Sequence, residues 1–155
     1  MVPRSLRRLP SPIVPRVLIA SDAPWVIDEV RSVIVAPDVE VVEIHTGAAV
    51  RQAVADDPPD LVILDLQIGN MGGMAVCLDL RLEEGGDRLP HVPVLMLLDR
   101  RADVFLARRS DAEGWLVKPL DPIRLGKAVR ILLGGGTYHD DAFKPQPVLV
   151  APREP

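Results

Sequence analysis

Three charged residues in this chain each come directly after, or one residue after, a short apolar run. Asp65 follows residues 61–64, Asp22 follows the first such run after one serine, and Lys118 follows the last. Strands that are apolar on both faces are typical of a parallel sheet covered by helices, and the carboxyl ends of such strands form the crevice that binds ligands. We therefore expect the two acids and the lysine to meet there. Their chemistry is that of phosphoryl transfer, with a carboxylate oxygen as the nucleophile and a lysine as the neutralising charge.

The elements that would position these residues alternate along residues 16–133. Alternating strands and helices predict a doubly wound α/β fold with a five-stranded parallel sheet, because parallel neighbours need helical crossovers. The second strand alternates polar and apolar residues and so belongs at an edge, which favours the flavodoxin-like order 2-1-3-4-5. Asp121-Pro122 marks the start of the last helix, as an N-cap followed by a proline in the first turn. The predicted strands are 16–21, 39–45, 61–65, 92–97 and 115–118, and the predicted helices start near residues 24, 48, 74, 102 and 122.

Composition limits the class of protein. A length of 155 residues suits one domain, and a net charge of −4 gives no reason to expect nucleic acid as a partner. A single cysteine, Cys77, excludes an internal disulfide and suits a reducing compartment. His45, His91 and His139 lack metal-ligand spacing, so we expect solvated or capping roles for them. With no 18-residue apolar stretch and no secretory signal, we expect a cytoplasmic protein without a membrane span.

Prolines mark both ends of the chain. Eight of the sixteen prolines lie in residues 1–15 and 145–155, and residues 1–15 carry three arginines and no acid. We therefore divide the chain into a basic proline-rich arm (1–15), a folded domain (16–133) and a Gly/Pro-rich arm (134–155). Prolines interrupted by short apolar runs suit binding along a partner's groove or sheet edge, whereas the alternative is a solvated tail.

At this point the chain resembles the receiver domain of bacterial response regulators, of the chemotaxis-regulator type. The matching motifs occur in the family's order and spacing, and together they cover nearly all of residues 16–133. They are residues 17–22, 59–65, 69–73, 93–98 and 114–119.

The resemblance implies a role for each charged residue. Asp65 would be an exposed acceptor of a phosphoryl group from a histidine kinase, and Lys118 would bind the phosphoryl oxygens. Mg²⁺ would be held by Asp22, Asp65 and the carbonyl of Gln67. Lys118-Pro119 would be a cis peptide bond. Two simpler interpretations stay open: Asp65 could cap a turn, and its pairing with Lys118 could serve stability alone.

Three departures from the family pattern weaken this chemistry. Ser21 replaces one acid of the metal-binding pair, so Mg²⁺ would bind weakly. Leu98 stands where the family has the serine or threonine that bonds the phosphoryl group and drives the switch. Asp99 stands where a small residue is preferred, and it would repel the incoming dianion unless Arg100 or Arg101 offsets it. Trp115 occupies the switch-aromatic position, but without that hydroxyl a half-buried aromatic on a sheet edge is the favoured interpretation.

We therefore expect a stand-alone receiver with a degenerate phosphorylation site, acting as a protein-binding or accessory module and not as an enzyme. Partners would bind the two arms and the face formed by the fourth helix, fifth strand and fifth helix. The chain also resembles stand-alone actinobacterial receivers, including one encoded beside the proton-pumping NADH dehydrogenase. That likeness implies a peripheral place on the cytoplasmic side of such a respiratory complex.

The same residues bear on two other functions. The alternative to the accessory module is a working two-component phosphoacceptor that receives its phosphate on Asp65. A phosphatase of the haloacid dehalogenase type would need a second aspartate two residues after the nucleophile, where Gln67 stands.

Overall fold

The computed structural model describes residues 14–34 and 38–140. Six parallel strands form one sheet in the order β2-β1-β3-β4-β5-β6. The order of the first five strands confirms the predicted 2-1-3-4-5 arrangement of a flavodoxin-like fold. The strands are β1 (Arg16–Ala20), β2 (Glu40–Ile44), β3 (Leu61–Asp65), β4 (Val94–Leu98), β5 (Gly114–Val117) and β6 (Tyr138–His139).

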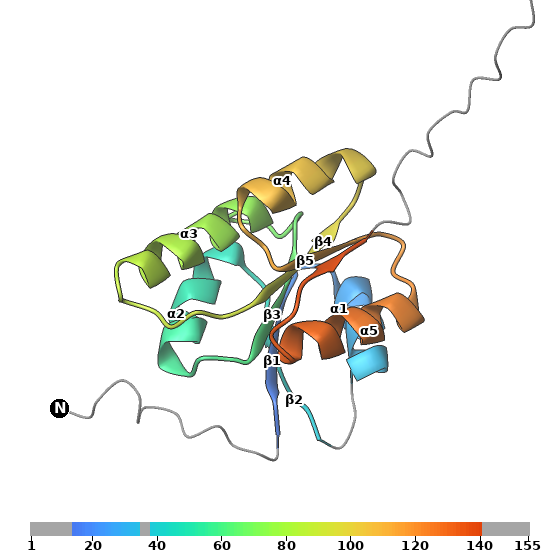
Figure 1. Cartoon of the computed structure of the whole chain (residues 1–155), viewed down its shortest axis with the longest axis horizontal. Helices are drawn as coiled ribbons and strands as arrows, with labels where there is room; N and C mark the ends of the chain where they lie inside the picture. Colours follow the sequence, from blue (N-terminus) through green and yellow to red (C-terminus); the bar gives the residue numbers. More distant parts are fainter. Residues whose placement is uncertain (1–13, 35–37, 141–155) are drawn as a thin grey trace, which may run out of the picture.

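Helices cover both faces of this sheet (Figure 1). On one face lie α1 (Pro24–Ile34) and α5 (Pro122–Leu133); on the other lie α2 (Val50–Asp56), α3 (Gly73–Gly85) and α4 (Val104–Arg109). The central strand shows why both layers are needed. Leu61 and Ile63 pack into the core beside α1 and α5, whereas Val62 and Leu64 pack into the core beside α2, α3 and α4. Alternate side chains of a strand point to opposite faces, so a strand that is apolar throughout needs a helix layer on each side.

The last long helix begins as the sequence predicts. The Asp121 carboxylate accepts the backbone N–H groups of Ile123, over 2.8 Å, and of Arg124, over 3.1 Å. Pro122 occupies the first turn, where it lacks only an N–H that would have no helical partner. This N-cap fixes where α5 starts, and therefore how far the chain runs between β5 and α5.

The sixth strand was not predicted. Tyr138 pairs with Gly114, and His139 pairs with Trp115, in parallel register along β5. An unpaired β5 edge would leave backbone donors and acceptors open, and a short Gly134–Gly136 connection brings the next residues back to it. The packed domain therefore continues past the predicted boundary at Leu133 as far as Asp140. Residues 1–13 and 141–155, which make up most of the two predicted arms, lie outside the described residues.

Candidate functional site

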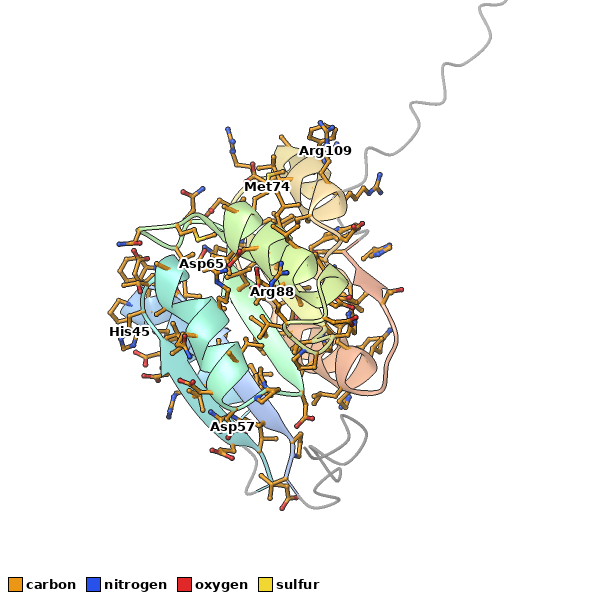
Figure 2. The ribbon with its side chains drawn as sticks, turned by 90° about the vertical axis from the view of Figure 1, so that its left-hand side faces the viewer. His45, Asp57, Asp65, Met74, Arg88 and Arg109 are labelled. Carbon is orange, nitrogen blue, oxygen red and sulfur yellow. The ribbon has the colours of Figure 1, made fainter. Side chains whose placement is uncertain are left out.

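Asp65 lies at the carboxyl end of the central strand, as predicted. β3 is flanked by β1 and β4, and Asp65 is in register with Leu97 of β4. Figure 2 shows Asp65 at the end of the sheet opposite Asp57. The carboxyl end of the central strand is where a doubly wound sheet places its reacting groups.

The Asp65 carboxylate is enclosed by hydrogen-bond donors. Ser21 Oγ donates to its Oδ2 over 2.7 Å, while Lys118 Nζ and the backbone N–H of Gln67 donate to its Oδ1 over 2.8 and 3.1 Å. Asp65 is only 2% exposed, so the expectation of an exposed acceptor is wrong for this arrangement. A buried carboxylate needs such donors, because an ionised group without partners is strongly disfavoured in a protein interior.

Lys118 bridges two carboxylates. Its Nζ lies 2.8 Å from Asp65 Oδ1 and 3.2 Å from Asp99 Oδ1. Burial works to lower the pKa of Lys118, but the hydrogen bonds and charges of Asp65 and Asp99 outweigh burial and raise that pKa above its ordinary value. The expected cis peptide bond between Lys118 and Pro119 is present. The sequence assigned Lys118 to Asp65 alone, and its second partner was missed.

Asp99 is paired with Lys118, which was not among the two candidates expected, Arg100 and Arg101. Arg100 pairs with Asp103, with 3.1 Å between Nη2 and Oδ1, and it closes a capping box at the turn before α4. The cation that faces Asp99 is Lys118. The second oxygen of Asp99, Oδ2, is buried and has no hydrogen-bond partner. Asp99 and Asp65 therefore share Lys118 as a hydrogen-bond donor.

Asp22 lies on the loop after β1, and its carboxylate accepts a hydrogen bond from the loop that follows β3. Its Oδ2 accepts the N–H of Gly69 over 3.0 Å, and a Cβ added to Gly69 would lie 2.7 Å from the same oxygen. The turn before α1 is instead closed by Ser21 Oγ, which accepts the N–H of Ala23 over 3.1 Å. A glycine at 69 thus lets the acceptor loop close onto Asp22.

These contacts bear on Mg²⁺. The three oxygen ligands implied by the resemblance come from Asp22, Asp65 and Gln67. Both carboxylates already accept hydrogen bonds, and Ser21 adds no charge. Over residues 14–34 and 38–140, no cluster of three acidic, histidine or cysteine side chains is placed to hold a metal ion. Asp22, Asp65 and the Gln67 carbonyl would supply three of the oxygen ligands that Mg²⁺ requires and leave the others to water, so these residues would hold the ion weakly.

The two switch positions are both in the core. Leu98 is fully buried, and Trp115 is 3% exposed, so the expectation of a half-buried aromatic on a sheet edge is wrong. The Trp115 ring stacks on His139 with centroids 4.0 Å apart and planes 4° from parallel, and the Arg108 guanidinium lies 5.6 Å from its centroid. His139 is exposed, as expected of a solvated histidine, and it also stacks on Trp115. The signal for β6 in the sequence was Thr137-Tyr138, two residues with high β-propensity directly after the glycines.

Comparisons with known proteins show the family of this chain. The family model for the response regulator receiver domain matches residues 17–130. A DNA-binding response regulator, MtrA of Mycolicibacterium smegmatis, is 32% identical over 120 residues, which is 76% of this chain and 50% of that protein. An uncharacterized response regulatory protein of Mycobacterium tuberculosis is 38% identical over 98 residues, covering 63% of this chain and 70% of the relative. The chain spans about half the length of the first of these relatives.

Solved structures show the same fold. The signal receiver domain of NarL from Mycobacterium tuberculosis is 30% identical, with a TM-score of 0.68 over 80% of this chain and 99% of that one. The chemotaxis response regulator CheY4 of Vibrio cholerae, at 22% identity and a TM-score of 0.67, covers 77% of this chain and 98% of its own, and it supports the fold alone. Within the described ranges, none of the helices is long and apolar enough to cross a membrane. Asp65 and Lys118 meet at the carboxyl ends of β3 and β5 in a chain that belongs to the response regulator receiver domain family.

Proposed function

We propose that this receiver domain accepts a phosphoryl group on Asp65 from the phosphohistidine of a histidine kinase. The observation that carries the proposal is the 2.8 Å contact between Lys118 Nζ and Asp65 Oδ1 at the carboxyl end of the sheet. An Asp65 oxygen would attack phosphorus, the phosphorus–nitrogen bond would break, and the imidazole would take up a proton. Lys118 would then neutralise part of the new charge.

The contacts of the resting site predict slow phosphorylation. Ser21 holds one oxygen of the acceptor by a hydrogen bond, and Asp99 holds the lysine that must turn toward the phosphoryl group. The Ser21–Asp65 and Asp99–Lys118 hydrogen bonds would both have to lengthen before the phosphoryl group is transferred to Asp65. We therefore expect modification over a longer time, or at a higher donor concentration, than in a receiver with an acidic pair.

The test is incubation with acetyl phosphate, with and without Mg²⁺, followed by intact-mass measurement. The parent should gain the mass of one phosphoryl group, and Asp65→Asn should not. Asp56→Asn, which removes an exposed acid at the end of α2, is the matched control and should be modified like the parent. A parent that gains no mass under any condition would end this proposal.

A second candidate is a protein-binding module that acts without phosphorylation, as the sequence favoured. The observation in its favour is that Phe105 on α4 and Ile123 on α5 are 60% and 81% exposed, which leaves apolar side chains beside β5 for a partner. Its test is recovery of the same partner from native extract by the parent and by Asp65→Asn, with loss on Phe105→Glu. Equal recovery by Phe105→Glu would contradict a docking role for this face.

Membership of a respiratory complex, on its cytoplasmic side, stays a prediction. It rests on the resemblance to actinobacterial stand-alone receivers, and co-purification with NADH dehydrogenase activity would test it.

A further inference from the structure

A groove of about 560 Å³ lies at the amino end of the sheet, beside the segments that lead into β3 and β4. Its lining comes from residues 57–60, which precede β3, and from residues 87–91 and 93, which precede β4. Figure 2 shows Asp57 at the end of the sheet opposite Asp65. The groove is therefore separate from the phosphoryl-acceptor site.

Three acids and four prolines give this groove its chemistry. The acids are Asp57, Asp60 and Asp87, and the prolines are at positions 58, 59, 90 and 93. Proline side chains are apolar, and their backbone has no N–H to donate. The lining therefore offers carboxylates within apolar walls.

The basic side chains of the lining are paired with acids that lie outside it. Arg88 Nε is 2.7 Å from Glu83 Oε2. His91 Nδ1 is 2.8 Å from Glu84 Oε1, and its Nε2 is 3.2 Å from Glu113 Oε1. The three aspartates therefore give the groove a negative character, which fits an occupant that carries cations.

The polypeptide enters the fold at the rim of this groove. The backbone N–H of Arg16 donates to Asp60 Oδ2 over 2.8 Å, and Arg16 Nη1 pairs with Asp57. Arg16 Nε is buried and has no hydrogen-bond partner among the described residues, although buried donors in proteins usually have one. The chain that precedes Arg16 therefore starts beside two of the three acids and beside a donor that a backbone carbonyl could satisfy.

The preceding segment carries the complementary charge. Residues 1–13 include Arg4, Arg7 and Arg8, contain no acid, and have prolines at positions 3, 10 and 12. An extended chain advances about 3.3–3.6 Å per residue, so the eight residues from Arg8 to Arg16 are long enough to cross the groove. Exposed ion pairs are individually weak, but a tethered segment acts at millimolar effective concentration, so weak pairs are sufficient.

We infer that residues 1–13 bind this groove of their own domain, with their arginines paired to the aspartates at the amino end of the sheet. The groove needs no phosphoryl group on Asp65, so this docking site is independent of the phosphoacceptor proposal. It also has a consequence for the predicted role of the basic arm in partner binding. Any protein that binds residues 1–13 must compete with the groove for them.

The first test is tryptic cleavage after the arginines of residues 1–13 in the full chain, followed over time by mass spectrometry. Asp60→Asn combined with Asp87→Asn removes two charges from the groove and keeps an amide oxygen as acceptor at each position. Asp111→Asn is the matched control. Asp111 is exposed and has a φ of 57°, close to the 58° of Asp87, but it lies after α4 and outside this groove.

We expect the double variant to be cleaved at least about threefold faster than the parent, because a docked arginine cannot enter the protease and each exposed pair contributes little. Asp111→Asn should be cleaved at the rate of the parent. Circular dichroism and thermal unfolding show that each variant is folded. Equal cleavage of the parent and the double variant would overturn the inference.

Amide chemical shifts provide a second measurement, in which the groove itself stays intact. Arg7→Gln combined with Arg8→Gln should shift the amides of residues 57, 60 and 87–89, and should leave that of Gly69, at the other end of the sheet, unchanged. Lys127→Gln, which removes an exposed charge on α5, should not shift the groove amides.

Two results of these measurements would contradict docking within one chain. The first is the absence of groove shifts in Arg7→Gln with Arg8→Gln. The second is a dependence of the cleavage rate and of the shifts on protein concentration, because the groove would then hold residues 1–13 of a second copy.

Discussion

Ser21 and Asp65 share a buried hydrogen bond, in which the Ser21 hydroxyl donates to Asp65 Oδ2 over 2.7 Å. Ser21 is completely buried and also accepts the N–H of Ala23, so its hydroxyl is held in place from both sides. A carboxylate at this position would face Asp65 as a like charge. The serine thus provides Asp65 with a hydrogen bond while adding no charge for a metal ion.

Ser21→Asp should make the fold depend on Mg²⁺. Without metal, a second buried carboxylate beside Asp65 should lower the free energy of unfolding by about 3 kcal/mol. Saturating Mg²⁺ should restore about 1–3 kcal/mol, because binding to the folded state alone stabilises it. Thermal unfolding with and without Mg²⁺ measures this. Ser21→Ala is the control, with a loss of about 1–3 kcal/mol and no response to metal. A parent stabilised by Mg²⁺ as strongly as Ser21→Asp would contradict the role given to the serine.

Asp99→Asn should speed the phosphorylation of Asp65. Removing this charge frees Lys118 for the acceptor and removes repulsion toward the incoming dianion. Because the Asp99 side chain is 34% exposed, solvent weakens the effect, and we expect a rate increase of about tenfold, or about 1.4 kcal/mol. Phosphate incorporation from acetyl phosphate over time provides the measurement, with Asp56→Asn as the control. An unchanged or slower rate would show that Asp99 does not compete for Lys118.

Lys118 should make stability fall at high pH. Its pKa is raised in the folded state, so its stabilising contribution is fully present below the ordinary value of 10.5 and is lost as pH rises through the higher folded value. Urea unfolding midpoints from neutral to strongly alkaline pH should therefore drop more steeply for the parent than for Lys118→Met. Parallel curves for the two proteins would mean that the lysine pairs equally well in the unfolded chain.

Cys77 should be inert in the native protein. The side chain is fully buried, its thiol donates to the Ser110 carbonyl over 3.2 Å, and burial raises its pKa to about 11. The reactive thiolate is therefore nearly absent at neutral pH. A thiol reagent should label the protein only after unfolding in urea. Leu82→Cys, at a position 66% exposed on α3, should add one site that labels at once in the folded state.

Trp115 should respond little to a phosphoryl mimic. A ligand shifts a conformational equilibrium only by its differential affinity for the two states, and Leu98 lacks the hydroxyl that would supply it. In Trp25→Phe, beryllofluoride with Mg²⁺ should leave Trp115 fluorescence almost unchanged, while Leu98→Thr should restore part of the response. A large change in the Leu98 protein would show that the switch works by another route.

The sequence by itself was enough to predict the fold class of this protein and the strand end at which Asp65 lies. Residues 61–64 are apolar at every position. This pattern predicts a strand with a helix layer on each face of the sheet, and it predicts that Asp65 lies at the end of that strand. The polar alternation of residues 39–45 placed that strand at an edge, and Asp121-Pro122 marked the start of the last helix. These are local patterns whose physical meaning does not depend on distant parts of the chain.

Only the tertiary structure decided how the site is connected. Ser21, Asp65, Asp99 and Lys118 come from four different strand ends, and which carboxylate oxygen each donor reaches follows from the register of those four strands. Likewise, Tyr138 and His139 form a strand only because they can pair with the edge of β5, and the sequence of residues 138–139 does not show that pairing. Pairings of this kind depend on packing between distant segments, and a single sequence shows the residue types but not the contacts that satisfy them.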